Sequence, residues 1–217
     1  MSNDSIECEE GCGCRFRRED AYVLSVDGMD HFFCCSDCAE EYRNVQTTET
    51  AGVLRKYIRA GHAVADIGSG SGYYIPLLLE LAGDGGRVYA IDRNQSSIEK
   101  IKSNHPSNIG HTLFAHVAEA YRLDFIPAGS VDFVLSNNVL CCTNRRNDAM
   151  REIHRILKDG GFAYIRSSTV YAEGIDPISE SEWDSLFENF TVLDSGAGHS
   201  IRWRIGSRKQ TDLLGEI

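Results

Sequence analysis

Glycine recurs at every second position after a short apolar run that contains an aspartate. Residues 64–74 read VADIGSGSGYY, in which Asp66 precedes Gly68, Gly70 and Gly72. Glycines between a strand and a helix let the backbone approach a ligand, and the N–H groups at the helix start point toward it. A carboxylate so close to the turn would repel a pyrophosphate but suits a cationic amino or sulfonium group. The turn therefore predicts a nucleotide-like ligand with a cationic part.

A second acidic residue ends the next apolar run, RVYAID. Its position, Asp92, is that of the acid which accepts hydrogen bonds from ribose hydroxyls in dinucleotide-binding folds. The dinucleotide fingerprint itself is G-x-G-x-x-G, whereas here the third glycine comes one residue early and Tyr73 takes its place. The alternative interpretations are a dehydrogenase and a doubly wound domain without a ligand. The spacing of the glycines disfavours a dehydrogenase.

Cysteines are the second group of residues with chemical potential. Six of the eight lie within the first 38 residues. Such crowding indicates disulfides in a secreted chain and metal ligation in a cytosolic one. The start MSNDSIECEE is acidic and lacks the apolar core of a secretory signal, so we expect a cytoplasmic protein. A module of fewer than about 40 residues buries little apolar surface, so a bound metal is physically expected.

The elements that must position these residues alternate along the chain from about residue 51. Strands are expected at 63–68, 87–92, 111–117, 131–137, 162–168, 191–195 and 199–208, and helices at 53–60, 74–82, 96–104, 148–157 and 179–190. Alternation at this spacing implies βαβ units with right-handed crossovers. We therefore expect an α/β fold with a doubly wound, mostly parallel sheet of seven strands.

The cysteine-rich part is expected to form a separate small module of a hairpin and a helix. Residues 21–33 hold two β-prone runs around Asp27-Gly28, a strong hairpin signal, and residues 36–44 predict a short helix. The polar stretch 44–50 is expected to be a linker. This division gives a metal-binding module at 1–45 and a second domain at 46–217.

Residues 51–208 resemble the class I S-adenosylmethionine-dependent methyltransferases. Four motifs stand in the order found in that family, namely DIGSGSG, AIDRN, AEAYRLDFIPAGSVDFVLSN and REIHRILKDGGFAYI. The resemblance implies a Rossmann-like sheet, S-adenosylmethionine as cofactor and methyl transfer to a small-molecule acceptor.

The resemblance also assigns roles to residues by position. Asp92 would hold the ribose with Arg93 beside it, and Glu119, where the family often has Asp, would contact the adenine. The methionine part would be lined by Asp66, Gly68, Ser69, Gly70 and Gly72. Ala120 completes the adenine contact, and Asn137 at the end of the fourth strand would face the methionine part and the acceptor.

Candidate groups for the reaction itself follow the fourth strand. Cys141 and Cys142 lie in LSNNVLCCTN, where loops at the carboxyl ends of strands build the site. They are interpreted as small buried residues, as ligands of a thiophilic acceptor such as arsenite, or as part of a site like that of a thiol methyltransferase. Together with Asn137 and His199 they are the catalytic candidates, and no general base stands in an obvious place.

The N-terminal stretch CGCRFRREDAYVLSVDGMDHFFCCSDCAEEY resembles the TRASH/YHS group of small metal-binding modules. That resemblance implies Cys12, Cys34 and Cys38 as ligands, with Cys14 or alternatively Cys8 as the fourth, and it leaves Cys35 spare. Four thiolates around zinc make a closed, structural site. Two roles stay open: a cap on the larger domain, or a sensor that captures a heavy metal or metalloid. A metal-responsive S-adenosylmethionine-binding regulator without turnover is the non-enzymatic alternative.

Charge limits the range of partners. The formal net charge is −10, and the acidic balance is strongest in the first 45 residues. An acidic surface disfavours nucleic-acid phosphates, and no apolar run is long enough for a membrane span. A small-molecule acceptor is therefore expected, while a basic protein substrate stays open.

Overall fold

The computed structural model describes residues 5–8, 15–26, 29–40, 48–171, 174–198 and 200–209. Its main element is a seven-stranded sheet in the order β10-β11-β9-β8-β5-β6-β7. These strands are β5 (Ala63–Ile67), β6 (Arg87–Asp92), β7 (Leu113–Val117), β8 (Val131–Asn137), β9 (Leu157–Ser168), β10 (Phe190–Ala197) and β11 (Ile201–Arg208). Strands β5 to β9 pair in parallel, and β10 and β11 pair antiparallel. The prediction of a mostly parallel seven-stranded sheet is confirmed.

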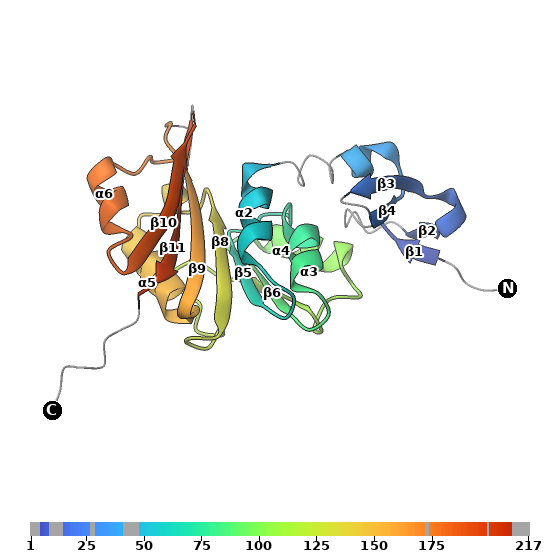
Figure 1. The fold of residues 1–217 in the computed structure, drawn as a ribbon, viewed down its shortest axis with the longest axis horizontal. Coiled ribbons are helices and arrows are strands. Elements are labelled where there is room, and N and C mark those ends of the chain that lie inside the picture. Colours follow the sequence, from blue (N-terminus) through green and yellow to red (C-terminus); the bar gives the residue numbers. More distant parts are fainter. Residues whose placement is uncertain are drawn as a thin grey trace.

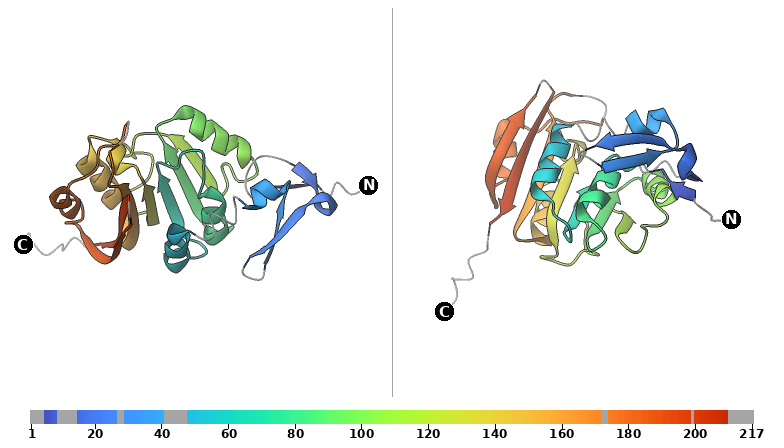
Figure 2. Two further views of the ribbon diagram at one scale, coloured as in Figure 1. Left: turned by 90° about the horizontal axis from the view of Figure 1, so that it is seen from above. Right: turned by 45° about the vertical axis from the view of Figure 1, so that its right-hand side comes forward.

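Helices cover both faces of this sheet, as Figures 1 and 2 show. Three of them, α2 (Glu49–Tyr57), α3 (Ile75–Ala82) and α4 (Gln95–Asn104), bury apolar residues in one core cluster. The other two, α5 (Arg146–Ile156) and α6 (Glu180–Ser185), contribute to the cluster on the opposite face. The fold is therefore doubly wound.

Helix α5 illustrates how the sequence pattern becomes a packed face. Its buried residues are Ala149, Met150, Ile153 and Ile156, which recur at helical spacing. The predicted helix ran to Leu157, but that residue already begins β9. Helix α6 is also shorter than predicted, because residues 186–189 form turns that lead directly into β10.

The N-terminal residues form their own small group of elements with a separate core cluster (Figure 1). Strands β1 (Ser5–Glu7) and β2 (Arg15–Arg17) pair antiparallel, and a short 3-10 helix η1 (Arg18–Asp20) follows. Strands β3 (Tyr22–Val26) and β4 (Met29–Phe33) form the expected hairpin, whose turn at 27–28 lies outside the described residues. Residues 36–40 are helical.

The last residues of the linker expected at 44–50 belong instead to helix α2. Thr48 is the N-cap of α2, and its side-chain oxygen accepts a hydrogen bond from the N–H of Ala51 at 3.0 Å. Residues 48–50 therefore belong to the start of a helix, because a threonine hydroxyl satisfies one of its free N–H groups. Residues 41–47 lie outside the described chain, and the domain boundaries stay a prediction.

The order of strands places a crevice at one edge of the sheet. From β5 the chain adds β6 and β7 on one side and then returns to add β8 and β9 on the other. Ligands of doubly wound folds bind at such a reversal, beyond the carboxyl ends of the strands. In this chain the glycine turn follows β5 directly at that point.

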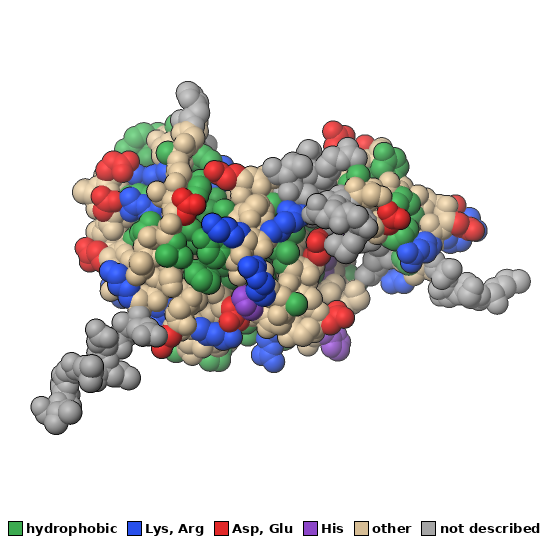
Figure 3. Space-filling model, in the orientation of Figure 1, with side chains coloured by type: hydrophobic (Ala, Val, Ile, Leu, Met, Phe, Trp, Pro, Cys, Tyr) green, Lys and Arg blue, Asp and Glu red, His purple; other side chains and the backbone are tan. Residues whose placement is uncertain are grey.

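The surface carries charges of both signs. Figure 3 shows Lys and Arg side chains interspersed with Asp and Glu side chains over the face in view. Among the described residues, no helix combines the length and the apolar composition that crossing a membrane requires.

Candidate functional site

The glycine turn has a backbone that side chains would strain. Gly68, Gly70 and Gly72 have φ values of 77°, 54° and 100°, a region that glycine enters without steric cost. The N–H groups of Gly68 and Ser69 both donate to the carbonyl of Ile91, at 2.7 and 2.9 Å. A Cβ at Gly68 would overlap the Val139 side chain. The turn is thus tied to β6 and packed against the loop after β8.

A cavity of about 320 Å³ opens beside this turn at the carboxyl ends of β5, β6, β7 and β8. It is called the cofactor cavity below, after the ligand that the sequence predicts. Six of the residues predicted to bind the cofactor line it: Gly68, Asp92, Arg93, Glu119, Ala120 and Asn137. The same wall includes residues that the sequence did not single out, namely Ile67, Ile91, Asn94, Ser97, Ala118, Asn138, Val139 and Thr143. The predicted residues therefore gather at one site from the ends of four strands.

The four other predicted cofactor residues, Asp66, Ser69, Gly70 and Gly72, do not line this cavity. For Asp66 the reason is the alternation of side chains along a strand. Its neighbour Ile67 lines the cavity, so the Asp66 side chain faces the other side of the sheet, with 2% of its surface exposed. Gly72 packs instead toward Ile101 of α4. Direct contact of these four residues with a cofactor stays a prediction.

The buried Asp66 carboxyl is electrostatically unusual. Burial, and to a lesser extent the negative charge of Asp92, raise its pKa to about 7. Its Oδ2 atom has no hydrogen-bond partner among the described residues, and the same holds for the buried hydroxyls of Ser69 and Ser136. A cation in the neighbouring cavity would favour the ionised carboxylate.

Asp92 is fixed at the edge of the cavity by two backbone groups. Its Oδ2 accepts a hydrogen bond from the N–H of Gly70, and its Oδ1 accepts one from the N–H of Asn94, both at 2.8 Å. A carboxylate oxygen has two acceptor lone pairs, so each oxygen retains capacity for one further donor. The Asp92 side chain thus suits a pair of vicinal hydroxyls, as a ribose offers.

The loop after β8 has a strained residue at the cavity wall. Asn138 has φ of 58° and is the non-glycine residue with positive φ within the described ranges. Its N–H donates to the carbonyl of Arg166 at 2.8 Å, and the Arg166 guanidinium donates to Asn137 Oδ1 at 2.9 Å. Asparagine tolerates this backbone region better than most residues, and such strain often accompanies functional sites. In the sequence, the two consecutive asparagines are the signal that could have indicated this backbone conformation.

The two cysteines of this loop lie side by side. Cys141 and Cys142 end the 3-10 helix η2 (Leu140–Cys142), and their Sγ atoms are 3.8 Å apart. Cys141 is buried and Cys142 is half-buried. Burial, together with the neighbouring Cys141, raises the pKa of the Cys142 thiol, whereas Arg93 lowers it. Cys142 lines the cofactor cavity, whereas the Cys141 side chain is buried.

A second cavity of about 330 Å³ begins at the same two cysteines. Its lining is Cys141, Cys142, Thr143, Asn144, Gly174, Ile175 and Asp176. Cys142 and Thr143 line both cavities and thus stand between a cofactor-sized space and an adjoining one.

Arg146 at the start of α5 holds this region together. Its guanidinium donates to the carbonyl of Leu140, to both carboxylate oxygens of Glu182, and to the carbonyl and carboxylate of Asp176. The Arg146 side chain is 10% exposed. A largely buried arginine with these partners fixes η2, α6 and residue 176 relative to one another. The predicted candidate His199 lies outside the described residues.

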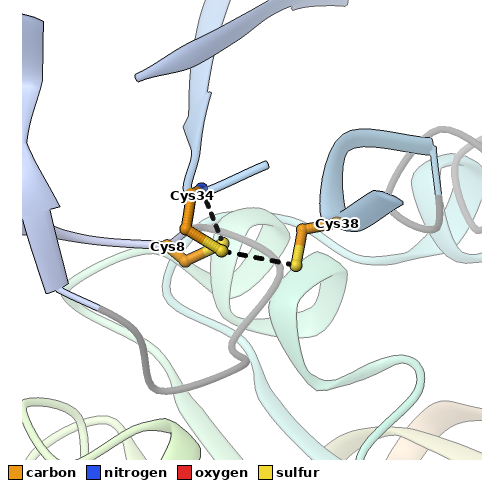
Figure 4. A group of neighbouring side chains, drawn as sticks. All are labelled: Cys8, Cys34 and Cys38. Atoms are coloured by element: carbon orange, nitrogen blue, oxygen red, sulfur yellow. Dashed lines mark hydrogen bonds between the residues drawn. The ribbon is translucent and has the colours of Figure 1, made fainter. Parts of the chain in front are cut away.

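Three cysteines of the N-terminal part form a compact thiol group (Figure 4). The sulfurs of Cys8, Cys34 and Cys38 all lie within 4.8 Å of one another, and those of Cys34 and Cys38 are 3.6 Å apart. The Cys34 N–H donates to the Cys8 sulfur at 3.4 Å. The geometry brings together three of the predicted ligands, including the alternative one, Cys8. Cys12 and Cys14 lie outside the described residues, and Cys35 is exposed.

Comparison with known proteins relates part of the larger domain to one family. Residues 65–165 match the family model described as "Methyltransferase domain". Residues 65–165 of this chain are thus similar to a methyltransferase domain. The match includes the residues that line the cofactor cavity, so it supports the prediction of an S-adenosylmethionine-dependent methyltransferase.

Two curated relatives align with part of this chain. Mouse arsenite methyltransferase is 33% identical over 121 residues, which is 50% of this chain and 31% of that protein. A protein-L-isoaspartate O-methyltransferase of Aeropyrum pernix is 39% identical over 64 residues, which is 27% of this chain and 25% of that protein. The chain thus spans about a third or less of the length of these relatives.

Solved structures share the fold of the methyltransferase domain. A SAM-dependent methyltransferase from Aquifex aeolicus has a TM-score of 0.64 at 18% identity and covers 78% of this chain and 97% of its own. An arsenic(III) S-adenosylmethionine methyltransferase from Chlamydomonas reinhardtii has a TM-score of 0.62 at 15% identity, covering 81% and 75%. At these identities the likeness shows the class I methyltransferase fold alone. The N-terminal thiol group lies outside the matched family model.

Proposed function

We propose that the protein transfers a methyl group from S-adenosylmethionine to a small-molecule acceptor. The observation that carries this proposal is the cavity beside the glycine turn, where the Asp92 carboxylate is held at the end of β6. Its acidic residues, Asp92 and Glu119, suit the hydroxyl and amino groups of an adenosine. The family match over the same residues supports this assignment.

The residues at hand fit the bound cofactor in charge and in hydrogen bonding. Asp92 would accept both ribose hydroxyls, Glu119 would accept from the adenine amino group, and Gly68 keeps the cavity clear of a side chain. When bound, S-adenosylmethionine supplies an electrophilic methyl group on a sulfonium. The chain then needs to orient a nucleophile and exclude water, which in favourable cases lowers a barrier by about 7–11 kcal/mol.

Cofactor binding tests this proposal directly. We expect calorimetry to show binding of S-adenosylmethionine and of S-adenosylhomocysteine, and none of NAD. Replacement of Asp92 by Ala should weaken S-adenosylmethionine binding at least about tenfold, since two charge-assisted hydrogen bonds are lost. Asp84→Ala is the matched control, because Asp84 is exposed and outside the cavity lining. Binding of NAD but not of S-adenosylmethionine would contradict the proposal.

For the N-terminal part, we infer that Cys8, Cys34 and Cys38 bind a zinc ion. The observation in support is their three sulfurs within 4.8 Å. Zinc in structural sites takes four ligands, and Cys12 and Cys14 are the predicted candidates for the fourth. Such a site would stabilise a part of the chain whose core cluster is small.

Metal analysis of the purified full chain tests this inference. We expect about one zinc per chain, and a loss of most of it in Cys8→Ser, because each thiolate supplies a ligand bond. Cys35→Ser is the control, since Cys35 is exposed and outside the three-sulfur group. Equal zinc content in the wild type and in Cys8→Ser would remove Cys8 from the ligand set.

A thiophilic acceptor is the acceptor class that the site favours. The relatives named above include arsenite methyltransferases, and here a cysteine thiol forms part of the wall between the two cavities. Small thiols and basic proteins are the other acceptors to assay. Formation of S-adenosylhomocysteine with any of them would exclude a regulator that binds S-adenosylmethionine without turnover.

A further inference from the structure

We propose that Cys141 and Cys142 together form a two-thiol site that binds a trivalent arsenical as the methyl acceptor. This inference rests on the proposed function, because it assigns the acceptor to the cavity that adjoins the cofactor. It differs from the N-terminal thiol group, which involves three other cysteines.

The separation of the two sulfurs suits chelation of one atom. They are 3.8 Å apart. At a bond length of about 2.3 Å, typical of thiolates on a soft ion, two sulfurs at this separation subtend an angle of about 110° at the bound atom. That angle is compatible with the pyramidal geometry of a three-coordinate centre.

The backbone around the pair is held in place by several hydrogen bonds. The carbonyl of Cys141 accepts from the N–H of Asp176 at 2.7 Å, and the N–H of Cys142 donates to the carbonyl of Val139 at 2.9 Å. Arg146 binds the carbonyl of Leu140 one residue before the pair, at 2.9 Å. Two thiols fixed in this way need little ordering when they bind a ligand.

The two cysteines fill only two of the three positions of a three-coordinate arsenic centre. A substrate site needs such an incomplete ligand set, because the bound atom must stay accessible. Apart from the two cysteines, the described lining of the second cavity offers oxygen atoms of Thr143, Asn144 and Asp176 and no further thiol or imidazole. A two-thiol site leaves the remaining position of a three-coordinate centre open to the cavities. A bound centre at Cys142 therefore lies on the border of the cofactor cavity, which Cys142 also lines.

The acceptor class follows from the reaction that the domain performs. A zinc or cadmium ion held by two thiolates has no lone pair with which to attack a methyl group, whereas trivalent arsenic has one. Arsenous acid exchanges two hydroxyl groups for the two cysteine sulfurs, and the thiol protons leave with them as two water molecules. The arsenic lone pair then bonds to the methyl carbon, while the electron pair of the methyl–sulfur bond stays on the departing sulfide. One transfer is balanced without a reductant, and further turnovers need an added thiol reductant.

Chemical protection in the full wild-type chain tests the binding step. We expect one equivalent of arsenite to slow alkylation of Cys142 by iodoacetamide at least tenfold, as measured by peptide mass spectrometry. The same chain alkylated without arsenite serves as the reference. Unchanged alkylation of Cys142 at saturating arsenite would overturn the inference.

A single-turnover assay tests the transfer step. We expect Cys142→Ser and Cys141→Ser each to reduce arsenite-dependent S-adenosylhomocysteine formation at least tenfold. In Cys141→Ser, whose side chain is outside the lining of the cofactor cavity, the Kd for S-adenosylmethionine should change less than about threefold. Cys35→Ser should retain the wild-type yield. A wild-type chain that binds S-adenosylmethionine but makes no methylated arsenic would overturn this inference and leave the proposed function intact. A chain that binds no S-adenosylmethionine would overturn the proposed function itself.

Discussion

Replacement of Asp66 by Asn is expected to stabilise the folded protein at pH 8 and to weaken cofactor binding. The Asp66 carboxyl is buried, and its Oδ2 has no hydrogen-bond partner in the described chain. Ionisation at this position is therefore unfavourable in the folded state. An amide of nearly the same shape removes the charge without creating a cavity.

The sign of the effect follows from the pKa of Asp66. In the folded state the pKa is about 7, against an ordinary value of 3.8. Between these values the folded state binds more protons than the unfolded state, so stability falls as pH rises from about 4 to about 7 and is then constant. The difference corresponds to at most about 4 kcal/mol above pH 7. Asp66→Asn recovers part of this free energy at pH 8 and little at pH 4.

Thermal unfolding at several pH values measures this prediction. We expect the Tm of Asp66→Asn to exceed that of the wild type by several degrees at pH 8, and the gap to close toward pH 4. Asp132→Asn is the matched contrast, because the Asp132 carboxylate accepts hydrogen bonds from the Ala63 N–H and the Lys158 ammonium. That variant should lose about 1 kcal/mol. A Tm of Asp66→Asn below the wild type at pH 8 would show that the carboxylate has a stabilising partner.

The same variant, Asp66→Asn, should bind the cofactor more weakly than the wild type, although it is more stable at pH 8. A cation in the cavity stabilises the ionised Asp66 carboxylate, and by linkage that carboxylate raises the affinity for the cation. We expect the wild-type Kd for S-adenosylmethionine to rise as pH falls from 8 to 6. The Kd of Asp66→Asn should be larger than that of the wild type at pH 8 and should depend less on pH.

Gly68→Ala is expected to have the second large effect. Gly68 has φ of 77°, which costs a residue with a side chain roughly 1–2 kcal/mol. The new methyl group would also overlap Val139, and overpacking of this kind typically costs about 1–3 kcal/mol. Together these effects should cost about 2–5 kcal/mol of stability. Because Gly68 and Val139 both line the cofactor cavity, we also expect at least tenfold weaker cofactor binding.

Two companion variants separate backbone strain from the steric overlap. Gly70→Ala has a similar positive φ, 54°, but its Cβ meets nothing within 4 Å, so it should cost only about 1–2 kcal/mol. The double variant Gly68→Ala with Val139→Ala removes most of the overlap and should recover part of the loss. Equal denaturant midpoints for Gly68→Ala and Gly70→Ala would mean that the Val139 loop yields without cost.

The sequence predicted the parts of this structure that follow from local patterns. Helical spacing at Met150, Ile153 and Ile156 located the buried face of α5, and glycines at positive φ located the turn after β5. The order of strands then brought Asp92 and Glu119 to the same cavity. These residues were predictable because parallel strands align their carboxyl ends at one edge of the sheet.

Other features depend on contacts between distant segments and gave little sequence signal. The Asp66 side chain faces away from the cavity because strand alternation, fixed by the register of β5 and β8, turns it to the other face. Asn138 and Val139 line the cavity through the path of one loop. Cys8 lies near Cys34 because β1 pairs with β2 and the chain then returns through the hairpin. Neither the spacing of the cysteines nor the family resemblance ranks Cys8 first.

The Arg146 network has a consequence for how this protein could diversify. The Arg146 guanidinium attaches η2 and residues 176–182 to α5, whereas the cofactor turn is attached to β6 through Ile91 and Asp92. The two halves of the site are thus supported by separate sets of bonds. Substitutions that reshape the second cavity can accumulate during evolution without loosening the turn, so a lineage of such chains can change its acceptor while its cofactor half is inherited unaltered.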